Sequence, residues 1–310
     1  MTSSPSIATI GVHIPSTRVS NLDRLSDFMI TQSFLTDKLG VEWRAIKDAQ
    51  DETSDLCVKA FYALQEKTNL DPAEVELLCV VTQNPDQRIP HTAAVVHQKL
   101  KIGKHCMTFD VSQGCAGYTH GLAIVSSLMA SLGLGHAILL TCDPYSKIVR
   151  SDDKNTALLF GDAATATYMS SKGGGYSLVD THFGTLPQSN SCLSCRESLH
   201  MNGRDVLNNA LREVPNSIQS LLRANSLSSA EVDLFVFHQA SKLMVELLRQ
   251  DLGLDESRAP FDIAKIGNTI SSSIPIMLEP YVEEREKQLI VLSGFGAGFS
   301  FASSLIKLID

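Results

Sequence analysis

Three residues far apart in the chain have side chains that together could carry out acyl transfer. Cys115 lies in DVSQGCAGYTHGL, His238 in VDLFVFHQAS and Asn268 in IGNTISSSIP. A cysteine thiolate can accept an acyl group from a thioester. A histidine and an asparagine can then donate hydrogen bonds to the carbonyl oxygen of a second thioester and stabilise the enolate that forms there.

Cys115 is expected at a turn between a buried strand that ends at Val111 and a long apolar helix. Apolar residues recur at helical spacing from Leu122 to Leu132, and Gly133 is suited to end the helix. We expect the cysteine in the first turn, where free N–H groups and the helix dipole favour thiolate over thiol. Small neighbours leave room for a substrate, as in a nucleophile elbow. A lone cysteine is more often a packing residue.

The other two candidates also have ordinary alternatives when each is taken singly. His238 follows the apolar segment 232–237, which predicts a histidine at the C-terminal tip of a buried strand, where α/β active sites are usually built. A satisfied core histidine is the alternative. Asn268 lies in a predicted turn and could equally cap a helix. Their positions within a duplicated chain favour one shared functional site over these three separate structural alternatives.

A glycine-rich segment, SGFGAGFS at 293–300, follows a predicted inner strand. Backbone N–H groups of Gly296 and Ala297, with that of Cys115, could form an oxyanion hole, because glycine permits close approach. A tight turn alone is the alternative. A phosphate-binding loop is disfavoured, because neither a helix-starting GxGxxG nor a GKS/T motif follows.

Composition restricts the classes of protein. A formal net charge of −8 argues against a nucleic-acid partner, and 44% hydrophobic with 19% charged residues is typical of a soluble α/β protein. We see no secretory signal at the start and no apolar run of membrane-spanning length. Seven cysteines, an odd number spread thinly, favour reduced thiols and a cytoplasmic location. Cys192 and Cys195 form a CxxC pair, but without further ligands at zinc spacing we predict a pocket-wall or surface loop and no metal site.

Apolar patterns predict the elements that must position these residues. We expect strands over 6–12, 75–81, 106–111, 136–141 and 163–169, and helices over 21–40, 51–68 and 90–101. Thr53 or Ser54 would cap the helix over 51–68. The almost wholly apolar run 75–81 fits a strand covered on both faces of a central sheet.

The chain also repeats itself. The segment AEVDLFVF at 230–237 echoes AEVELLCV at 73–80, an offset of 157 residues, and the strands 137–141 and 289–293 match at about 152. Each copy should lead into a helix, a short strand and a Gly-containing turn, with Cys115 in the first turn and Asn268 in the second. Such a constant offset argues for duplication.

We expect an α/β fold with two thiolase-like halves, 1–170 and 171–310. Two sheets would enclose a shared helical layer, with further helices outside, as an αβαβα sandwich. The helices after Cys115 and Asn268 would be the central pair, and their N-terminal turns would face one pocket.

These segments, with TQNPDQRIPHTAAVVHQKL, LFGDAATA and MNGRDVLNNA, resemble the ketoacyl-acyl-carrier-protein synthase III family of the thiolase superfamily over essentially the full length. The resemblance implies the five-layered thiolase fold, a homodimer, and no cofactor beyond acyl-CoA as substrate. It implies that acyl-CoA loads Cys115 and that malonyl-acyl-carrier protein is then decarboxylated in a Claisen condensation. The 3-ketoacyl product would serve fatty acid or specialised-metabolite biosynthesis.

The chain departs from the family pattern around the expected CoA site. Where the family has an adenine-stacking Trp and two arginines, it has Phe34, Lys38 and Lys147, and the motif HQAN ends in Ser241, followed by Lys242. The resemblance implies CoA or carrier contacts for these five residues. The departures favour a secondary synthase with a longer acyl donor or a specialised pathway.

Two other functions compete with condensation. In the first, the acyl group moves from Cys115 to an alcohol or amine without decarboxylation, but Asn268 argues against it because enolate stabilisation is its clearest use. In the second, the chain is a degenerate subunit that only dimerises, but such subunits tend to lose the nucleophile. Thiolases are disfavoured because 293–300 lacks a second cysteine, and elongating synthases because they have histidine where Asn268 stands.

Overall fold

A mixed sheet of nine strands organises the structure, a computed structural model that describes residues 4–310. The order across the sheet is β11-β12-β13-β8-β1-β7-β6-β4-β5. These strands are β1 (Ser6–His13), β4 (Leu77–Val81), β5 (Met107–Val111), β6 (His136–Cys142), β7 (Ala164–Ser170), β8 (Gly175–Thr185), β11 (Leu234–Phe237), β12 (Leu289–Gly296) and β13 (Ser300–Ile309).

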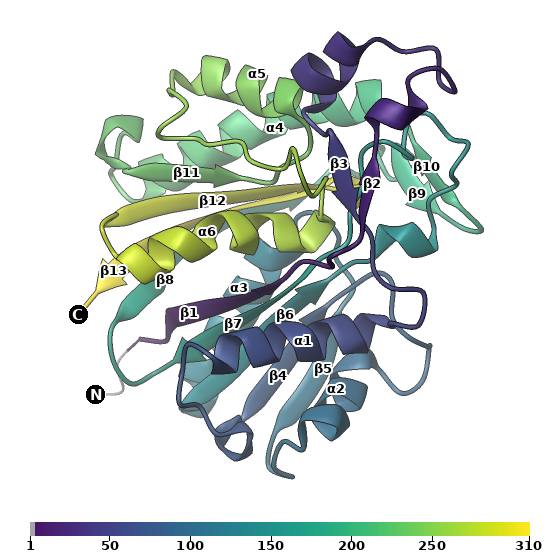
Figure 1. The fold of residues 1–310 in the computed structure, drawn as a ribbon. Helices are drawn as coiled ribbons and strands as arrows, with labels where there is room; N and C mark the ends of the chain where they lie inside the picture. Colours follow the sequence, from purple (N-terminus) through teal and green to yellow (C-terminus); the bar gives the residue numbers. More distant parts are fainter. Residues whose placement is uncertain (1–3) are drawn as a thin grey trace.

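Residues 4–310 form six α-helices, which lie within and around this sheet. They are α1 (Thr53–Gln65), α2 (Thr92–Leu100), α3 (Gly117–Leu132), α4 (Gly203–Ala224), α5 (Lys242–Leu252) and α6 (Ser273–Glu284). In Figure 1, α3 and α6 lie between the two parts of the sheet, α1 and α2 cover the outside of one part, and α4 and α5 the outside of the other. The expected five-layered thiolase fold is confirmed.

The two parts of the sheet are joined along one short seam. Ser6 pairs with Ser177 and Ile7 with Tyr176, which connects β1 to β8. Every strand on the β1 side of this seam comes from residues before 171, and every strand on the β8 side from residues after it. The division at 170–171, between β7 and β8, stays a prediction.

Alternating side chains of the inner strands serve two different cores. Leu77, Cys79 and Val81 of β4 belong to the cluster around the central helices. Leu78 and Val80 belong to the cluster under α1 and α2. Because successive side chains of a strand point to opposite faces, a strand between two helical layers must be apolar throughout.

The central helix α3 is adapted to burial from both sides. It contains no charged residue, and Tyr118, Leu122, Val125 and Met129 are all buried. It contacts β4 and β6 on one side and β12, β13 and β8 on the other. A charged side chain on these faces would have to be buried without water, which is costly.

The remaining elements are short. Two small two-stranded sheets pair β2 (Arg18–Ser20) with β3 (Trp43–Ala45), and β9 (Leu193–Cys195) with β10 (Leu199–Met201). Within residues 4–310, no helix is both long and apolar enough to cross a membrane. The single-turn segments are η1 (Leu22–Arg24), η2 (Phe34–Leu39), η3 (Pro72–Glu74), η4 (Tyr145–Lys147), η5 (Ser229–Glu231), η6 (Ile270–Ser272) and η7 (Ala297–Phe299).

Three local predictions are wrong. The helix over 21–40 is two short segments, η1 and the π-helical η2, separated by Met29, whose φ of 48° cannot continue a helix. The N-cap of α1 is Glu52, whose N–H donates to the Asp55 carboxylate, so neither Thr53 nor Ser54 caps it. No strand forms between α5 and Asn268, which makes only one isolated bridge, with Phe160.

We expect Leu122→Ala to lower the free energy of unfolding by about 2–5 kcal/mol, because it opens a cavity in the central layer. Leu132→Ala on the same helix is the control, since Leu132 is 52% exposed whereas Leu122 is fully buried. Urea unfolding monitored by circular dichroism measures both changes. Equal losses in the two variants would contradict the central position of α3.

Candidate active site

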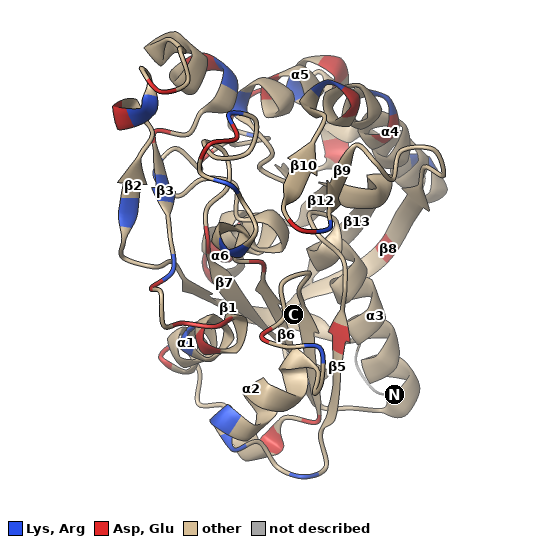
Figure 2. Ribbon diagram, turned by 90° about the vertical axis from the view of Figure 1, so that its right-hand side faces the viewer, with Lys and Arg blue, Asp and Glu red and all other residues tan. Residues whose placement is uncertain are grey.

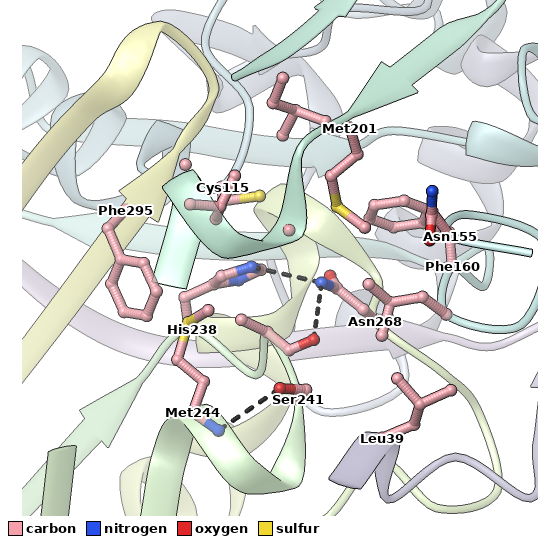
Figure 3. A pocket seen from close by; sticks show the side chains of 16 residues that line it. Leu39, Cys115, Asn155, Phe160, Met201, His238, Ser241, Met244, Asn268 and Phe295 are labelled. Atoms are coloured by element: carbon pink, nitrogen blue, oxygen red, sulfur yellow. Dashed lines mark hydrogen bonds between the residues drawn. The ribbon is translucent and has the colours of Figure 1, made fainter. Parts of the chain in front are cut away.

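Cys115, His238 and Asn268 line one cavity of about 670 Å³. Cys115 lies in the turn before α3, His238 directly after β11, and Asn268 in the loop before α6. Figure 3 shows the three side chains around the same space, with Phe295 beside the imidazole. The sequence therefore predicted correctly that both halves of the chain contribute to one pocket.

Cys115 differs from its prediction in position and in acidity. The N-cap of α3 is Ala116, so Cys115 lies one residue before the cap and not in the first turn of the helix, as was expected from the sequence. Burial, and after it the negative charge of Asp143, raise the pKa of the Cys115 thiol, although its own backbone N–H acts in the opposite direction. Loss of solvation therefore favours the thiol in the resting protein, against the predicted preference for thiolate.

Two glycines at the end of β12 allow the last inner strand to reach the cysteine. A Cβ atom on Gly296 would lie 2.9 Å from the Cys115 sulfur, and one on Gly294 would lie 2.8 Å from the Cys115 carbonyl oxygen. Any larger residue would push the strand away from the thiol. Ala297 follows at the start of η7. The role of these N–H groups as an oxyanion hole stays a prediction.

His238 is a buried, neutral imidazole whose orientation is fixed by a hydrogen bond to Ser273. Its Nδ1 lies 2.6 Å from Ser273 Oγ, which donates to the Ile270 carbonyl at 3.0 Å. The Nδ1–H therefore donates to Ser273, and Nε2 is left as an acceptor. Burial lowers the pKa of His238 to about 3. The Phe295 ring lies edge-on to the imidazole at 5.5 Å between centroids.

Asn268 presents its amide nitrogen to the cavity because its side-chain oxygen already accepts a hydrogen bond from the protein. Oδ1 accepts from the Ile270 N–H at 2.9 Å, and Nδ2 lies 3.4 Å from both His238 Nε2 and the Ala240 carbonyl. Its backbone is anchored to the first half of the chain: its N–H donates to the Leu159 carbonyl, and its own carbonyl accepts from the Gly161 N–H, both at 2.9 Å.

Asp143 is a buried residue of the site that the sequence analysis did not single out. Its carboxylate accepts from the Gln83 N–H and from Ser271 Oγ, each at 2.6 Å. It thereby links the ends of β4 and β6 to the segment after Asn268. Burial raises its pKa to about 6, against the opposing effect of these hydrogen bonds. Its position two residues beyond the predicted end of the strand over 136–141 was the available signal.

The five residues expected to contact CoA or a carrier do not all lie together. Ser241 is the N-cap of α5 and lines the cavity. Phe34 and Lys38 belong to η2, which packs against α5, the helix that begins with Lys242. Lys147 is different, because its ammonium forms an ion pair with Glu52 at 2.7 Å. The binding roles stay predictions.

The CxxC pair forms no disulfide. Cys192 is buried, Cys195 is exposed at the end of β9, and both are free thiols. Among residues 4–310, no group of three or more His, Cys, Asp and Glu side chains is placed to hold a metal ion. Cys195 lines a second cavity, as the pocket-wall alternative predicted.

We expect Asp143→Asn to alter how stability depends on pH. In the folded chain the pKa of the Asp143 carboxyl group is raised from 3.8 to about 6. The free energy of unfolding of the wild type therefore falls as pH rises from 4 to 6, because the folded state must then bury an ionised carboxylate that water solvates in the unfolded state. The variant should lose that decrease and gain up to about 3 kcal/mol over wild type between pH 4 and 6. Urea unfolding at stepped pH, with exposed Asp152→Asn as control, measures it. Parallel pH curves for the variant and wild type would contradict the assignment.

Comparisons with known proteins place the chain in a family. The family model described as 3-oxoacyl-[acyl-carrier-protein (ACP)] synthase III matches residues 109–187, and the model of its C-terminal part matches 222–308, together more than half of the chain. The chain is 29% identical to a beta-ketoacyl-[acyl-carrier-protein] synthase III of Clostridium beijerinckii over 97% of this chain and 98% of the relative. It is 28% identical to that of Neisseria meningitidis serogroup B, over the same shares.

Solved structures of related proteins have the same fold as this chain. The crystal structure of 3-oxoacyl-[acyl-carrier-protein] synthase III from Aquifex aeolicus superposes with a TM-score of 0.90 at 26% identity, over 98% of this chain and 99% of the other. A crystal structure of Xanthomonas campestris OleA has a TM-score of 0.89 at 20% identity over 98% and 97% of the two chains, a likeness of fold alone. The matched segments include the turn with Cys115 and the loop with Asn268, and the chain belongs to the 3-oxoacyl-[acyl-carrier-protein] synthase III family.

Proposed function

We propose that this protein is a condensing acyltransferase that joins the acyl group of an acyl-CoA to malonyl-acyl-carrier protein and releases a 3-ketoacyl product. The observation that carries the proposal is the single cavity shared by Cys115, His238 and Asn268. A thiol can hold the acyl group there, while an imidazole and an amide nitrogen are placed to act on a second thioester. Family membership supports the same reaction and a place in fatty acid biosynthesis.

The first step loads the enzyme. Because both groups are neutral at rest, the Cys115 proton passes to His238 Nε2 as the sulfur attacks the thioester carbonyl of acyl-CoA. A new carbon–sulfur bond forms to Cys115, and the bond to the CoA sulfur breaks. The proton then moves from His238 to that sulfur, so that CoA leaves as a thiol. The N–H groups of Gly296 and Ala297 are our candidates for holding the oxyanion.

The second step forms the carbon–carbon bond. The malonyl carboxylate leaves as carbon dioxide, and its electron pair becomes an enolate whose oxygen accepts hydrogen bonds from His238 Nε2–H and Asn268 Nδ2–H. The enolate carbon attacks the acyl carbonyl, the bond to Cys115 breaks, and the departing thiolate takes up a proton from solvent water. The Ser273 hydroxyl can accept from Nδ1 in the first step and donate to it in the second, so it supports both tautomers.

A reducing, cytoplasmic setting belongs to the same proposal. All seven cysteines are free in residues 4–310, including the buried Cys115 that the reaction needs as a thiol. An oxidising compartment would favour oxidation of the exposed Cys195 and of the Cys115 nucleophile. CoA would enter from the side of η2 and α5, where Lys38 and Lys242 have no acidic partner within ion-pair distance among the described residues.

We also propose that the protein is a homodimer, joined through the face that carries β5, α3 and β8. In the described chain, β5 is an edge strand of the sheet, with no strand on its outer side. Met107, Ile124 and Phe183 are 44%, 37% and 67% exposed. Figure 2 shows β5, α3 and β8 on the face turned to the viewer, where charged residues are few. An unpaired edge with apolar neighbours favours pairing with a second copy.

We expect Asn268→Ala to separate the two steps. Acylation of Cys115 by acyl-CoA should continue, whereas release of carbon dioxide from malonyl-acyl-carrier protein should fall at least about a hundredfold, because one donor to the enolate is lost. Intact-mass analysis measures the acyl-enzyme, and labelled carbon dioxide measures the second step. Asn208→Ala, on the exposed side of α4, is the control.

Two results would refute the proposed function. In one, Cys115 in the wild-type protein takes up no acyl group from any acyl-CoA. In the other, acyl-Cys115 forms but passes its acyl group only to a hydroxyl or amine acceptor and never to malonate. The second outcome would establish the non-decarboxylating alternative.

We expect Phe183→Asp to shift the protein from dimer to monomer, because it places a charge in the proposed apolar contact. Tyr62→Asp is the control, since Tyr62 is 52% exposed on α1, in the opposite outer layer. Sedimentation velocity at micromolar concentration distinguishes the two states. A wild-type monomer, or a dimer that survives Phe183→Asp and dissociates with Tyr62→Asp, would refute this interface.

A further inference from the structure

A second cavity, of about 810 Å³, shares Leu193 with the cavity that contains Cys115. Cys115 is not one of its lining residues, but two of them, Gln83 and Ala297, adjoin residues that surround the thiol. The Gln83 carboxamide lies against Gly114, where a Cβ atom would be 2.6 Å from Gln83 Oε1, and Ala297 follows the glycine that touches the sulfur. An acyl group bound to Cys115 can therefore extend toward this space.

The two cavities differ in the chemistry of their walls. The catalytic cavity is surrounded mainly by apolar side chains, among them Leu39, Leu159 and Met244. The second cavity is lined mainly by side chains that carry polar atoms, which are Gln83, Asn84, Ser112, Tyr145, Ser194, Cys195 and Arg196. A saturated hydrocarbon chain would remove water from these groups and give them no hydrogen bond in return, which is unfavourable.

Gln83 offers a directed donor to this cavity. The buried Tyr145 hydroxyl donates to Gln83 Oε1 at 3.1 Å, so the opposite atom of the carboxamide, Nε2, is the one left to donate. The backbone of Gln83 is held by Asp143, and the Tyr145 ring packs on Phe160 at 4.9 Å between centroids. The carboxamide is therefore oriented before any ligand binds, which lowers the entropic cost of using it.

Arg196 supplies an unpaired positive charge to the same wall. It is an exposed residue that lines the cavity, and within residues 4–310 no acidic side chain lies within ion-pair distance of its guanidinium. A guanidinium and an amide donor beside one cavity match the two oxygens of a carboxylate. In the described part of the chain, neither Gln83 Nε2 nor the Arg196 guanidinium has a hydrogen-bond acceptor from the protein.

We propose that the second cavity selects an acyl group that ends in a carboxylate, so that the loaded donor is a short dicarboxylic acid joined to CoA through one end. The terminal carboxylate would accept from Gln83 Nε2 and from Arg196, while the thioester carbon is held at Cys115. This inference rests on the proposed function, because it assumes that Cys115 carries an acyl group. It assigns Gln83 and Arg196 as residues that determine specificity.

The test compares acyl-CoAs of matched length with and without the terminal carboxylate. For wild type, we expect kcat/KM for acylation of Cys115 to be at least about tenfold higher with glutaryl-CoA than with pentanoyl-CoA, the size of one charge-assisted hydrogen bond. Arg196→Gln and Gln83→Leu should each reduce this ratio toward one, and Arg196→Lys should retain part of it. Arg212→Gln is the control, since Arg212 is exposed on α4, beside Glu213.

Each outcome decides the proposal. Equal or faster loading of pentanoyl-CoA by wild type, or an unchanged ratio in Arg196→Gln, would overturn it, while formation of a 3-ketoacyl product from any donor would leave the proposed function intact. Failure of every acyl-CoA to load Cys115 would overturn both. Because Gln83→Leu replaces a half-buried residue, the urea midpoint of unfolding of this variant is measured as well. If Gln83→Leu does not fold, the result for Arg196→Gln, a substitution of an exposed residue, decides the proposal.

Discussion

The burial of an uncharged helix between two parts of a sheet is the constraint on which the rest of the structure depends. α3 can be covered on both sides only because its sequence offers no charge to either part, and α6 shares the same layer. Burial of apolar area on both sides of the layer stabilises it by roughly 25 cal/mol for each Å² removed from water. That layer brings the turn before α3 and the loop before α6 to one edge, where Cys115 and Asn268 meet His238.

The same burial determines the protonation states of Cys115 and His238. Without solvent, neither a thiolate nor an imidazolium is stabilised at rest, and the pKa values of Cys115 and His238 move in opposite directions, each toward the neutral form. The negative charge of the buried Asp143 further raises the pKa of Cys115, and its carboxylate links two parts of the chain through Gln83 and Ser271. A thiol that becomes nucleophilic only as its proton leaves is protected from chance alkylation and oxidation, and is activated when a thioester is present.

Much of the fold could be predicted from sequence because the inner strands are apolar on both faces and the duplicated landmarks keep a constant offset. The three candidate residues that line one cavity could be singled out because Cys115 and His238 follow predicted strands and Asn268 lies in a predicted turn. The errors have local causes. The positive φ of Met29 interrupts an otherwise helical pattern, and a sequence pattern does not report that conformation. The acidity of Cys115 depends on burial and on Asp143, which are properties of the assembled layers. Gln83 and Arg196 acquire a shared role only through the shape of a cavity.

The anchoring of Asn268 to the other half of the chain has a consequence for how this sequence can diverge. Its backbone pairs with Leu159 and Gly161, and a Cβ atom on Gly161 would lie 1.9 Å from the Ile266 carbonyl oxygen. Replacement of that glycine during evolution would therefore displace an amide side chain more than a hundred positions away. A substitution at Gly161 would therefore be tolerated only together with a compensating change in the segment around Ile266, in the other half of the chain.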